Sequence, residues 1–455
     1  MCGDIKEEID MIVLIKCIQV LLALSLLILI HELGHFAFAK FFGIRVDKFF
    51  LFFDAGGVKL FSTKTTGWFT RLFPKMKEAD TEYGIGWLPL GGYCKICGMV
   101  DESFDVEGLK SEPKPWEFRS KPAWQRLIVM FGGVFNNFLF AIIVYVAMFA
   151  IWGDNYVSNK DSRIYANPFA EEMGFRTGDR ILSFDDYVPE DFSMLQADLA
   201  RRSVHEAKVL RGGDTVSIYI DHNMIGDVLS TPGMFTLAIP FVVDSLPSGS
   251  INYDSGLISG DRIVRIDTAA VEYRQDATPI LRAFAGKSVT ASVVRGSDTL
   301  AVPLQVDTAG MIGVFVHYPG LEHRDYTVAQ AIPAGVKYTF GMIGGYVRDL
   351  KLVATPSTGA YKSVGSFISI GQIFPSTWNW YIFVNLLALL SIMLGVMNLI
   401  PIPALDGGHM VFAIYEMLTG KKPSDKFMVA AQFVGMFLLM LLMILAFGND
   451  ISRLL

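Results

Sequence analysis

The chain has 455 residues, of which 52% are hydrophobic and only 18% are charged, and its mean hydropathy is +0.41. Soluble domains average about 25% charged residues, so this composition favours a membrane protein with room for soluble domains beside the membrane part. The net charge of −6 gives no reason to expect a nucleic-acid partner, and four cysteines are too few for a disulfide-bonded scaffold.

Four apolar stretches are long enough to cross a lipid bilayer as helices. A span needs about 20 apolar residues, and the first stretch, residues 11–30, runs without a turn signal into HELGHFAFAKFFG. Acidic residues before it, and the lack of a small-residue cleavage site after it, argue against a signal peptide. The other stretches are residues 127–151, 381–400 and 427–447. We therefore expect a polytopic α-helical membrane protein with four transmembrane helices.

The segment between the first two spans, residues 43–122, has strand character. It contains FFLFFDAGGVKLFS and IGWLPLGGYCKICGM, two aromatic-rich runs punctuated by glycine. Backbone at membrane depth must satisfy its own hydrogen bonds, so we expect a membrane-associated β-hairpin or small sheet. Cys94 and Cys97 form a C-x-x-C pair that could bind a metal or cycle through a disulfide. We favour two ordinary thiols in a strand, because the pair stands alone.

The polar region between spans two and three repeats itself. The pattern G-x-x-x-G-D-R-I begins at Gly174 and again at Gly256, and R-G-x-D-T begins at Arg211 and again at Arg295. Offsets of 82 and 84 residues are typical of a small domain, so we expect two tandem α+β domains. The pattern resembles PDZ domains, which bind extended peptides at a sheet edge. The expected domains are residues 154–240 and 241–325, between membrane halves at residues 1–153 and 326–455.

The first span carries three ionisable residues in the order His31-Glu32-Leu-Gly-His35. On a helix the two histidines share one face, so both imidazoles can reach one zinc ion while Glu32 holds a water molecule. This is the H-E-x-x-H arrangement of metalloproteases, and Zn2+ is the expected cofactor. The alternative is a helix that ends at Ile30 and leaves a polar turn at the interface. Ionisable groups in a span are costly and functional by default, which favours catalysis.

A catalytic zinc needs a third protein ligand, and Asp406 in NLIPIPALDGGH is the candidate. With four spans, spans one and three cross in the same direction. The two histidines and an aspartate at the end of span three would therefore lie at the same depth. Taken alone, Asp406-Gly-Gly would be a capped helix terminus and turn. His409 could compete as a ligand, although an extra histidine is more often a surface or supporting residue.

Together these motifs resemble the site-2 protease family of intramembrane zinc metalloproteases over nearly the whole chain. The resemblance rests on HELGH, the tandem PDZ-like repeats, FRSKPAWQR before span two and NLIPIPALDGGH. The site residues that it implies are the zinc ligands His31, His35 and Asp406, the general base Glu32, and the substrate-binding residues Asn398, Pro401 and Pro403. Two departures are Val134, where the family has proline in its span-two motif, and the cysteines at 94 and 97.

The resemblance also implies substrates and a location. Substrates would be single-span membrane proteins, such as an anti-sigma factor or signal-peptide remnants, after a first cut by another protease, with the PDZ-like pair as a filter. The location would be a bacterial inner membrane. Basic residues flanking spans two and four place both termini and the PDZ-like domains in the periplasm. The alternatives are a transporter or channel, for which the spans show no repeat, and a catalytically dead scaffold, although every expected site residue is present.

Overall fold

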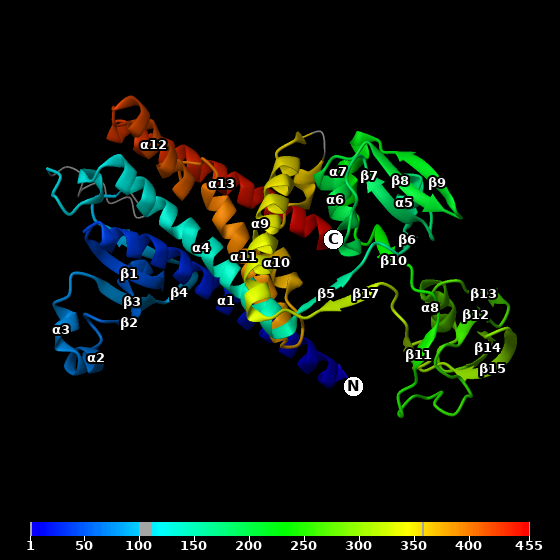
Figure 1. The fold of residues 1–455 in the computed structure, drawn as a ribbon. Coiled ribbons are helices and arrows are strands. Elements are labelled where there is room, and N and C mark those ends of the chain that lie inside the picture. The colour runs from blue at the N-terminus through cyan, green and yellow to red at the C-terminus, as the bar shows by residue number, and fades with distance from the viewer. Residues whose placement is uncertain (1, 100–111, 357–358, 455) are drawn as a thin grey trace. The chain divides into compact units, whose positions relative to one another are not determined.

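The computed structural model of the protein describes residues 2–99, 112–356 and 359–454, which form two compact units (Figure 1). One unit contains residues 1–153, 325–351 and 363–455, and the other contains residues 154–324 and 352–362. The first unit therefore holds the expected spans and the second holds the repeated region. Residues 100–111, which belong to the expected membrane-associated β segment, lie outside the described residues.

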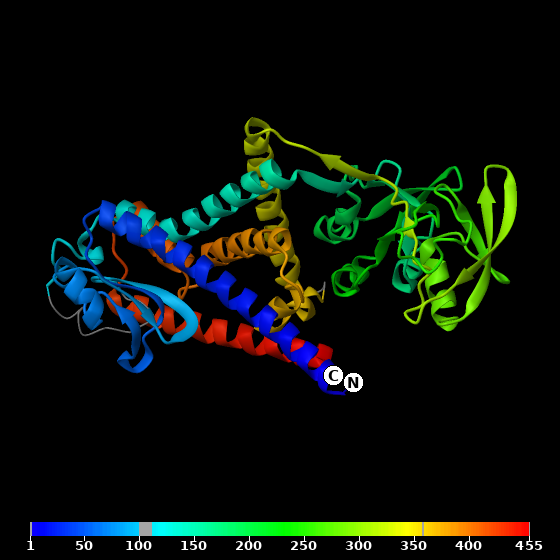
Figure 2. The same cartoon turned by 90° about the horizontal axis from the view of Figure 1, so that it is seen from below.

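Four helices in the described part of the chain are long and apolar enough to cross a membrane. They are α1 (Cys2–Phe41), α4 (Ala123–Trp152), α11 (Trp380–Leu399) and α13 (Asp425–Leu454). Helix α4 packs against both α1 and α11, as the two views of the ribbon show (Figure 1 and Figure 2). The four apolar helices expected from the sequence are confirmed.

Three more helices of this unit are α9 (Val328–Val353), α10 (Phe367–Ile373) and α12 (Asp406–Thr419). Helix α9 approaches α4 closely at Gly335, where a Cβ atom would lie 2.6 Å from the side chain of Val146. Helix α10 begins at a cap shared with the end of α13, because the Asp450 carboxylate accepts hydrogen bonds from Ser366 N at 2.8 Å and Ser366 Oγ at 2.6 Å. Helix α9 is therefore packed against α4, and the start of α10 is hydrogen-bonded to α13.

A four-stranded sheet follows α1. Its strands are β1 (Val46–Phe53), β2 (Lys59–Ser62), β3 (Glu82–Gly86) and β4 (Leu88–Ile96), in the order β2-β3-β1-β4, with the short helices α2 (Gly67–Leu72) and α3 (Pro74–Lys77) between β2 and β3. Strands β1 and β3 run parallel, and the other pairs are antiparallel. Edge strand β4 lies against α1 at Gly92, where a Cβ atom would come within 2.9 Å of the Ile28 side chain. Glycine here lets a strand edge reach the helix that carries the histidines.

The second unit contains the repeated motifs, and each copy makes the same buried contacts. Asp179 and Asp261 are fully buried, and each carboxylate receives two hydrogen bonds from one arginine, Arg211 at 2.8 Å and Arg295 at 2.7 Å. The same guanidinium groups also donate to the carbonyl oxygens of Gly174 and Gly256. Two hydrophobic clusters form separate cores, one around each network. The sequence repeat is therefore also a repeat of structure.

The sheets of this unit are β7-β8-β9 and β13-β12-β14-β15, with the two-stranded pairs β10-β6, β11-β16 and β17-β5. The strands are β5 (Asp154–Val157), β6 (Ile164–Ala166), β7 (Arg180–Phe184), β8 (Glu206–Arg211), β9 (Asp214–Tyr219), β10 (Phe235–Leu237), β11 (Val243–Ser245), β12 (Arg262–Ile266), β13 (Ala269–Ala270), β14 (Ser288–Arg295), β15 (Asp298–Gln305), β16 (Phe315–Val316) and β17 (Leu321–Arg324). The helices are α5 (Pro168–Glu172), α6 (Leu195–Arg201), α7 (Ile225–Ser230) and α8 (Arg274–Ala283). The pair β5–β17 joins the two ends of the region, with Val157 opposite Leu321.

Candidate active site

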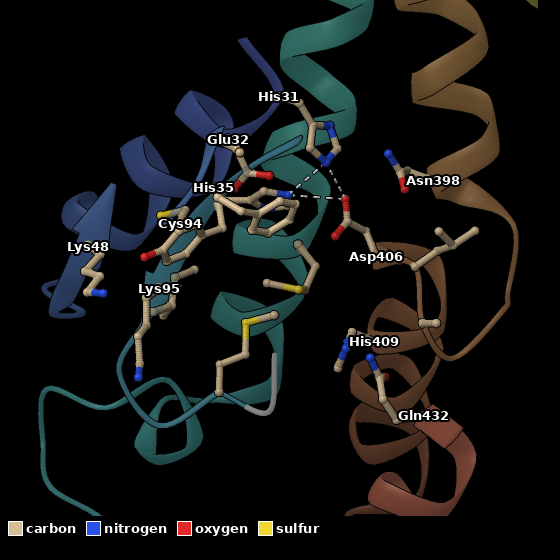
Figure 3. Close-up of a pocket in the computed structure, with 18 of the residues that line it drawn as sticks. His31, Glu32, His35, Lys48, Cys94, Lys95, Asn398, Asp406, His409 and Gln432 are labelled. Atoms are coloured by element: carbon tan, nitrogen blue, oxygen red, sulfur yellow. Dashed lines mark hydrogen bonds and ion pairs between the residues drawn. The ribbon is translucent and has the colours of Figure 1, made fainter. Parts of the chain in front are cut away.

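Two side chains of α1 and one from a distant part of the sequence meet at one point beside α4 (Figure 3). His31 and His35 lie one turn apart on α1, and Asp406 is the first residue of α12. The Nε2 atoms of the two histidines are 3.3 Å apart, and each lies 3.2 Å from Asp406 Oδ2. Both imidazoles are buried. The structure thus brings together the three residues expected to be metal ligands.

The orientation of the His35 ring leaves its Nε2 atom free to bind a cation. Its Nδ1 atom lies 2.9 Å from the carbonyl oxygen of Val129. Since a carbonyl can only accept a hydrogen bond, Nδ1 carries the proton and Nε2 presents a lone pair. A hydrogen bond from the second ring nitrogen to a backbone carbonyl is the usual support of a metal-binding histidine.

The His31 ring is supported by Asn137 on α4, whose amide nitrogen is 3.1 Å from His31 Nδ1. The amide oxygen of Asn137 is buried and has no partner in the described part of the chain. Rotation of this amide by a half turn lets the oxygen accept the Nδ1 proton, since the two amide atoms are interchangeable in shape. The His31 Nε2 atom then also presents a lone pair toward Asp406.

This arrangement fits a zinc ion. Two imidazole lone pairs and a carboxylate oxygen face one another, and such groups repel unless a cation lies between them. Asp406 Oδ2 is buried and accepts no hydrogen bond from any described residue. Ligands at roughly 2.0–2.1 Å from a tetrahedral zinc are separated by about 3.3 Å, which matches the spacing of these three atoms. Two nitrogens and one carboxylate oxygen are a common donor set for catalytic zinc.

Glycines on α1 and α4 make this arrangement possible. A Cβ atom at Gly34 would lie 2.1 Å from the carbonyl oxygen of Gly132, so the two helix backbones touch at this point. A Cβ atom at Gly133 would lie 2.5 Å from His35 Nε2 and 2.6 Å from His31 Cε1. Sequence reasoning missed these supporting residues. The signal that was available is the span-two motif Gly133-Val-Phe-Asn-Asn137-Phe138, which was compared with the family without assigning a role to Gly133 or Asn137.

The expectation that Asp406 lies at the end of span three is wrong. Helix α11 ends at Leu399, and a loop precedes α12, which begins at Asp406. Pro401 and Pro403 lie in this loop, where a proline cannot donate the backbone hydrogen bond that would continue a helix. The loop returns Asp406 toward α1 as part of a separate helix, which also packs against α4.

His31, His35 and Asp406, which we call the three-donor cluster, lie at the wall of a cavity of about 590 Å³. Glu32 lines this cavity, and its carboxylate accepts a hydrogen bond from the backbone N–H of Cys94 on β4. Asn398 from the end of α11 lines it as well, whereas Pro401 and Pro403 do not. His409 reaches the cavity but is not part of the three-donor cluster. Burial lowers the pKa of His409, so its ring is neutral and offers one donor and one acceptor.

The C-x-x-C pair does not form a disulfide. The Cys97 thiol donates a hydrogen bond to Asp47 at 3.4 Å. Burial, together with the negative charge of Asp47, raises the pKa of the Cys97 thiol to about 11. A thiol with this pKa is protonated at neutral pH and is a poor nucleophile and metal ligand. Cys94 lies in β4, whereas Cys97 lies just after its end at Ile96, so the structure agrees with ordinary thiols but places only the first of them in the strand.

Comparison with known proteins agrees with this site. The family model "Peptidase family M50" matches residues 19–442. The regulator of sigma-E protease RseP of Escherichia coli is 28% identical over 469 aligned residues, which cover 95% of this chain and 98% of that protein. Two proteins named as zinc metalloproteases, from Neisseria meningitidis and Xylella fastidiosa, are each 27% identical to this chain. Both alignments cover 95% of this chain, and they cover 98% of the Neisseria protein and 97% of the Xylella protein.

The family match covers α1 from residue 19, all of α4 and α11, and α13 up to residue 442, together with His31, His35 and Asp406. The match confirms the resemblance that the sequence motifs indicated. It also confirms the prediction that this chain is a zinc-dependent peptidase. The chain therefore belongs to peptidase family M50, the site-2 protease family of zinc metalloproteases.

Proposed function

We propose that this protease cuts membrane-spanning substrates at a zinc site held by His31, His35 and Asp406. The observation that carries the proposal is the meeting of three metal-type donors on and beside an apolar helix, 3.2–3.3 Å from one another. A site built on a span is within reach of peptide bonds that enter the membrane. Intramembrane ionisable residues are functional by default, and these have a specific partner set.

In this proposal Glu32 is the general base. Zinc, when bound, activates a water molecule and polarises the scissile carbonyl. Glu32 would take a proton from the attacking water as the C–O bond forms and would then deliver it to the amine nitrogen, so that the C–N bond breaks and the amine leaves. The Cys94 N–H holds the carboxylate of Glu32 in the cavity. Val129 and Asn137 keep the Nδ1 atoms of the histidines occupied, so only Nε2 faces the cavity.

We place the substrate strand along β4, at the edge of the sheet. A transmembrane helix hides its carbonyl groups, so it must unwind before a peptide bond can be attacked. Strand β4 is an edge strand that lines the cavity from Gly92 to Ile96, and edge strands bind extended peptides through backbone hydrogen bonds. Asn398 would contact this peptide from the other side. Pro401 and Pro403 would act indirectly, because they shape the loop that leads to Asp406.

The test is cleavage of a single-span reporter by purified enzyme in detergent. We expect about one zinc per chain, a cut within or at the edge of the reporter's apolar segment, loss of cleavage with a chelator, and recovery on adding zinc. A photoreactive residue near the cut should crosslink to β4. Zinc-independent cleavage, or a cut far outside the apolar segment, would contradict the proposal.

The second unit is proposed to be a pair of PDZ domains, at residues 154–240 and 241–325, that filters substrates. Support comes from the duplicated Asp–Arg networks and from the two separate cores. The Escherichia coli relative is named as a regulator of sigma-E protease, which supports an anti-sigma factor as one substrate, cut after another protease. Signal-peptide remnants are a second candidate. The proposed location is a bacterial inner membrane, and the basic residues flanking spans two and four support a periplasmic position for the PDZ pair and both termini.

Removal of the second unit should widen the range of substrates. The register of β5 and β17 allows a clean deletion, because Val157 and Leu321 are opposite each other and a two-residue Asn-Gly turn can replace residues 158–320. Leu352 packs in the first core and should become serine in the same variant. We expect faster cleavage of substrates with bulky outer domains and unchanged cleavage of the small reporter. Unchanged discrimination would refute the filter.

A further inference from the structure

Span four supplies a polar side chain to the catalytic cavity that the mechanism above does not use. Most large apolar side chains of α13 face outward, as expected for a helix against lipid, but Gln432 is only 3% exposed. Gln432 lines the cavity that contains Glu32 and Asp406. In Figure 3 its side chain reaches toward His409, on the side of the cavity that faces Cys94 and Lys95. A glutamine buried at this position needs an explanation.

The position of Gln432 is set by a close packing contact one turn further along α13. A Cβ atom at Gly435 would lie 2.8 Å from the backbone nitrogen of Ala404 and 2.9 Å from the carbonyl carbon of Pro403. Residues three apart lie on the same face of a helix, so this contact holds Gln432 against the loop that leads to Asp406. The glutamine is therefore fixed beside the site by α13 itself.

Neither Gln432 nor His409 has its hydrogen bonds satisfied. Within the ranges that the structure describes, no residue accepts or donates a hydrogen bond to the Gln432 amide or to the His409 ring, whose ring contact is with Phe412. Buried polar side chains are almost always hydrogen-bonded. Gln19 on α1 is buried as well, but its amide nitrogen donates to the carbonyl oxygen of Pro375 at 2.9 Å, and only its amide oxygen has no partner among the described residues. Gln432 has no such partner in the described part of the chain, and it lines the cavity.

We propose that Gln432, together with His409, forms a subsite that binds the backbone of the unwound substrate beside the scissile bond. A carboxamide offers both a donor and an acceptor, which matches the N–H and C=O of an extended peptide. Strand β4 would pair with one edge of that peptide and Gln432 with the other. Such contacts do not depend on the substrate's side chains, so they add affinity without narrowing the sequence preference. This inference rests on the proposed function.

The test replaces Gln432 with leucine, which has a similar size but no hydrogen-bonding group. In Gln432→Leu we expect KM for the single-span reporter to rise about tenfold, with kcat and bound zinc little changed. Gln432→Asn, which keeps an amide, should recover part of the loss. The matched control is Gln19→Leu, which removes a buried but bonded glutamine and should lower thermal stability without raising KM. An unchanged KM in Gln432→Leu with zinc retained overturns the subsite.

A crosslinking experiment covers the case in which Gln432→Leu does not fold or load zinc. A photoreactive residue at position 432 and another at position 93, each in the Glu32→Gln background, should capture the same short segment of the reporter. Absence of a crosslink from position 432, while position 93 captures the reporter, would mean that water alone satisfies Gln432 and would overturn the subsite. If the natural sequence does not cut the reporter at all, the proposed function fails first.

Discussion

Glu32→Gln should reduce the rate of peptide cleavage by roughly 10²–10⁴-fold while leaving about one zinc bound per chain. The amide keeps the shape of the side chain and can still accept the hydrogen bond from the Cys94 N–H. It cannot take a proton from water. The three metal donors are on other residues, so zinc binding should persist.

Metal content and single-turnover cleavage of the reporter, measured on the same preparation, separate the two effects. Glu322→Gln, which removes a carboxylate on β17 in the other compact unit, is the matched control and should cut normally. Full activity in Glu32→Gln would remove Glu32 from the mechanism. Loss of zinc together with activity would instead make Glu32 a ligand.

Gly133→Ala should weaken zinc binding by about 10–100-fold and reduce cleavage at least as much, although residue 133 carries no reactive group. The added methyl carbon would lie 2.5 Å from His35 Nε2 and 2.6 Å from His31 Cε1, too close for either ring to stay in place. Displacing the rings would also break the contacts of Nδ1 with Val129 and Asn137. A shift of about 1 Å in a catalytic group can cost a hundredfold in rate.

Competition with a chromogenic chelator measures the zinc affinity of this variant, and thermal unfolding shows whether the helices still pack. Gly448→Ala on α13 is the control, because a Cβ atom there has nothing within 4 Å. Normal zinc affinity in Gly133→Ala would mean that α4 moves away easily, and that the tight contact does not position the histidines.

Local features of this protein followed from its sequence. Apolar length alone located the four spans, and the four-residue spacing of His31 and His35 placed both rings on one face. Two motifs that recur at offsets of 82 and 84 residues identified the duplicated region. The expected small sheet after the first span is present, although its association with the membrane remains a proposal.

Features that depend on contacts between distant segments could not be predicted. Asp406 was chosen correctly as a neighbour of the histidines but was placed at the end of span three, because the residue pattern did not show that a separate helix begins at Asp406 after the proline-containing loop. Gly133 and Asn137 act only through the packing of α4 on α1. The parallel pairing of β1 with β3 also could not be predicted, because the residue pattern of a strand does not indicate which strand it pairs with.

The three proposed zinc ligands are divided between the two ends of the chain, and this has a consequence for how the enzyme is made. Asp406 follows His35 by 406 − 35 = 371 residues. At a synthesis rate of about 5–20 residues per second, the histidines are in the membrane for roughly 20–75 s before the aspartate leaves the ribosome. During this interval the nascent protein has only two of its ligands and cannot hold a catalytic metal. With this set of ligands, the protease stays inactive until most of the chain has been synthesised.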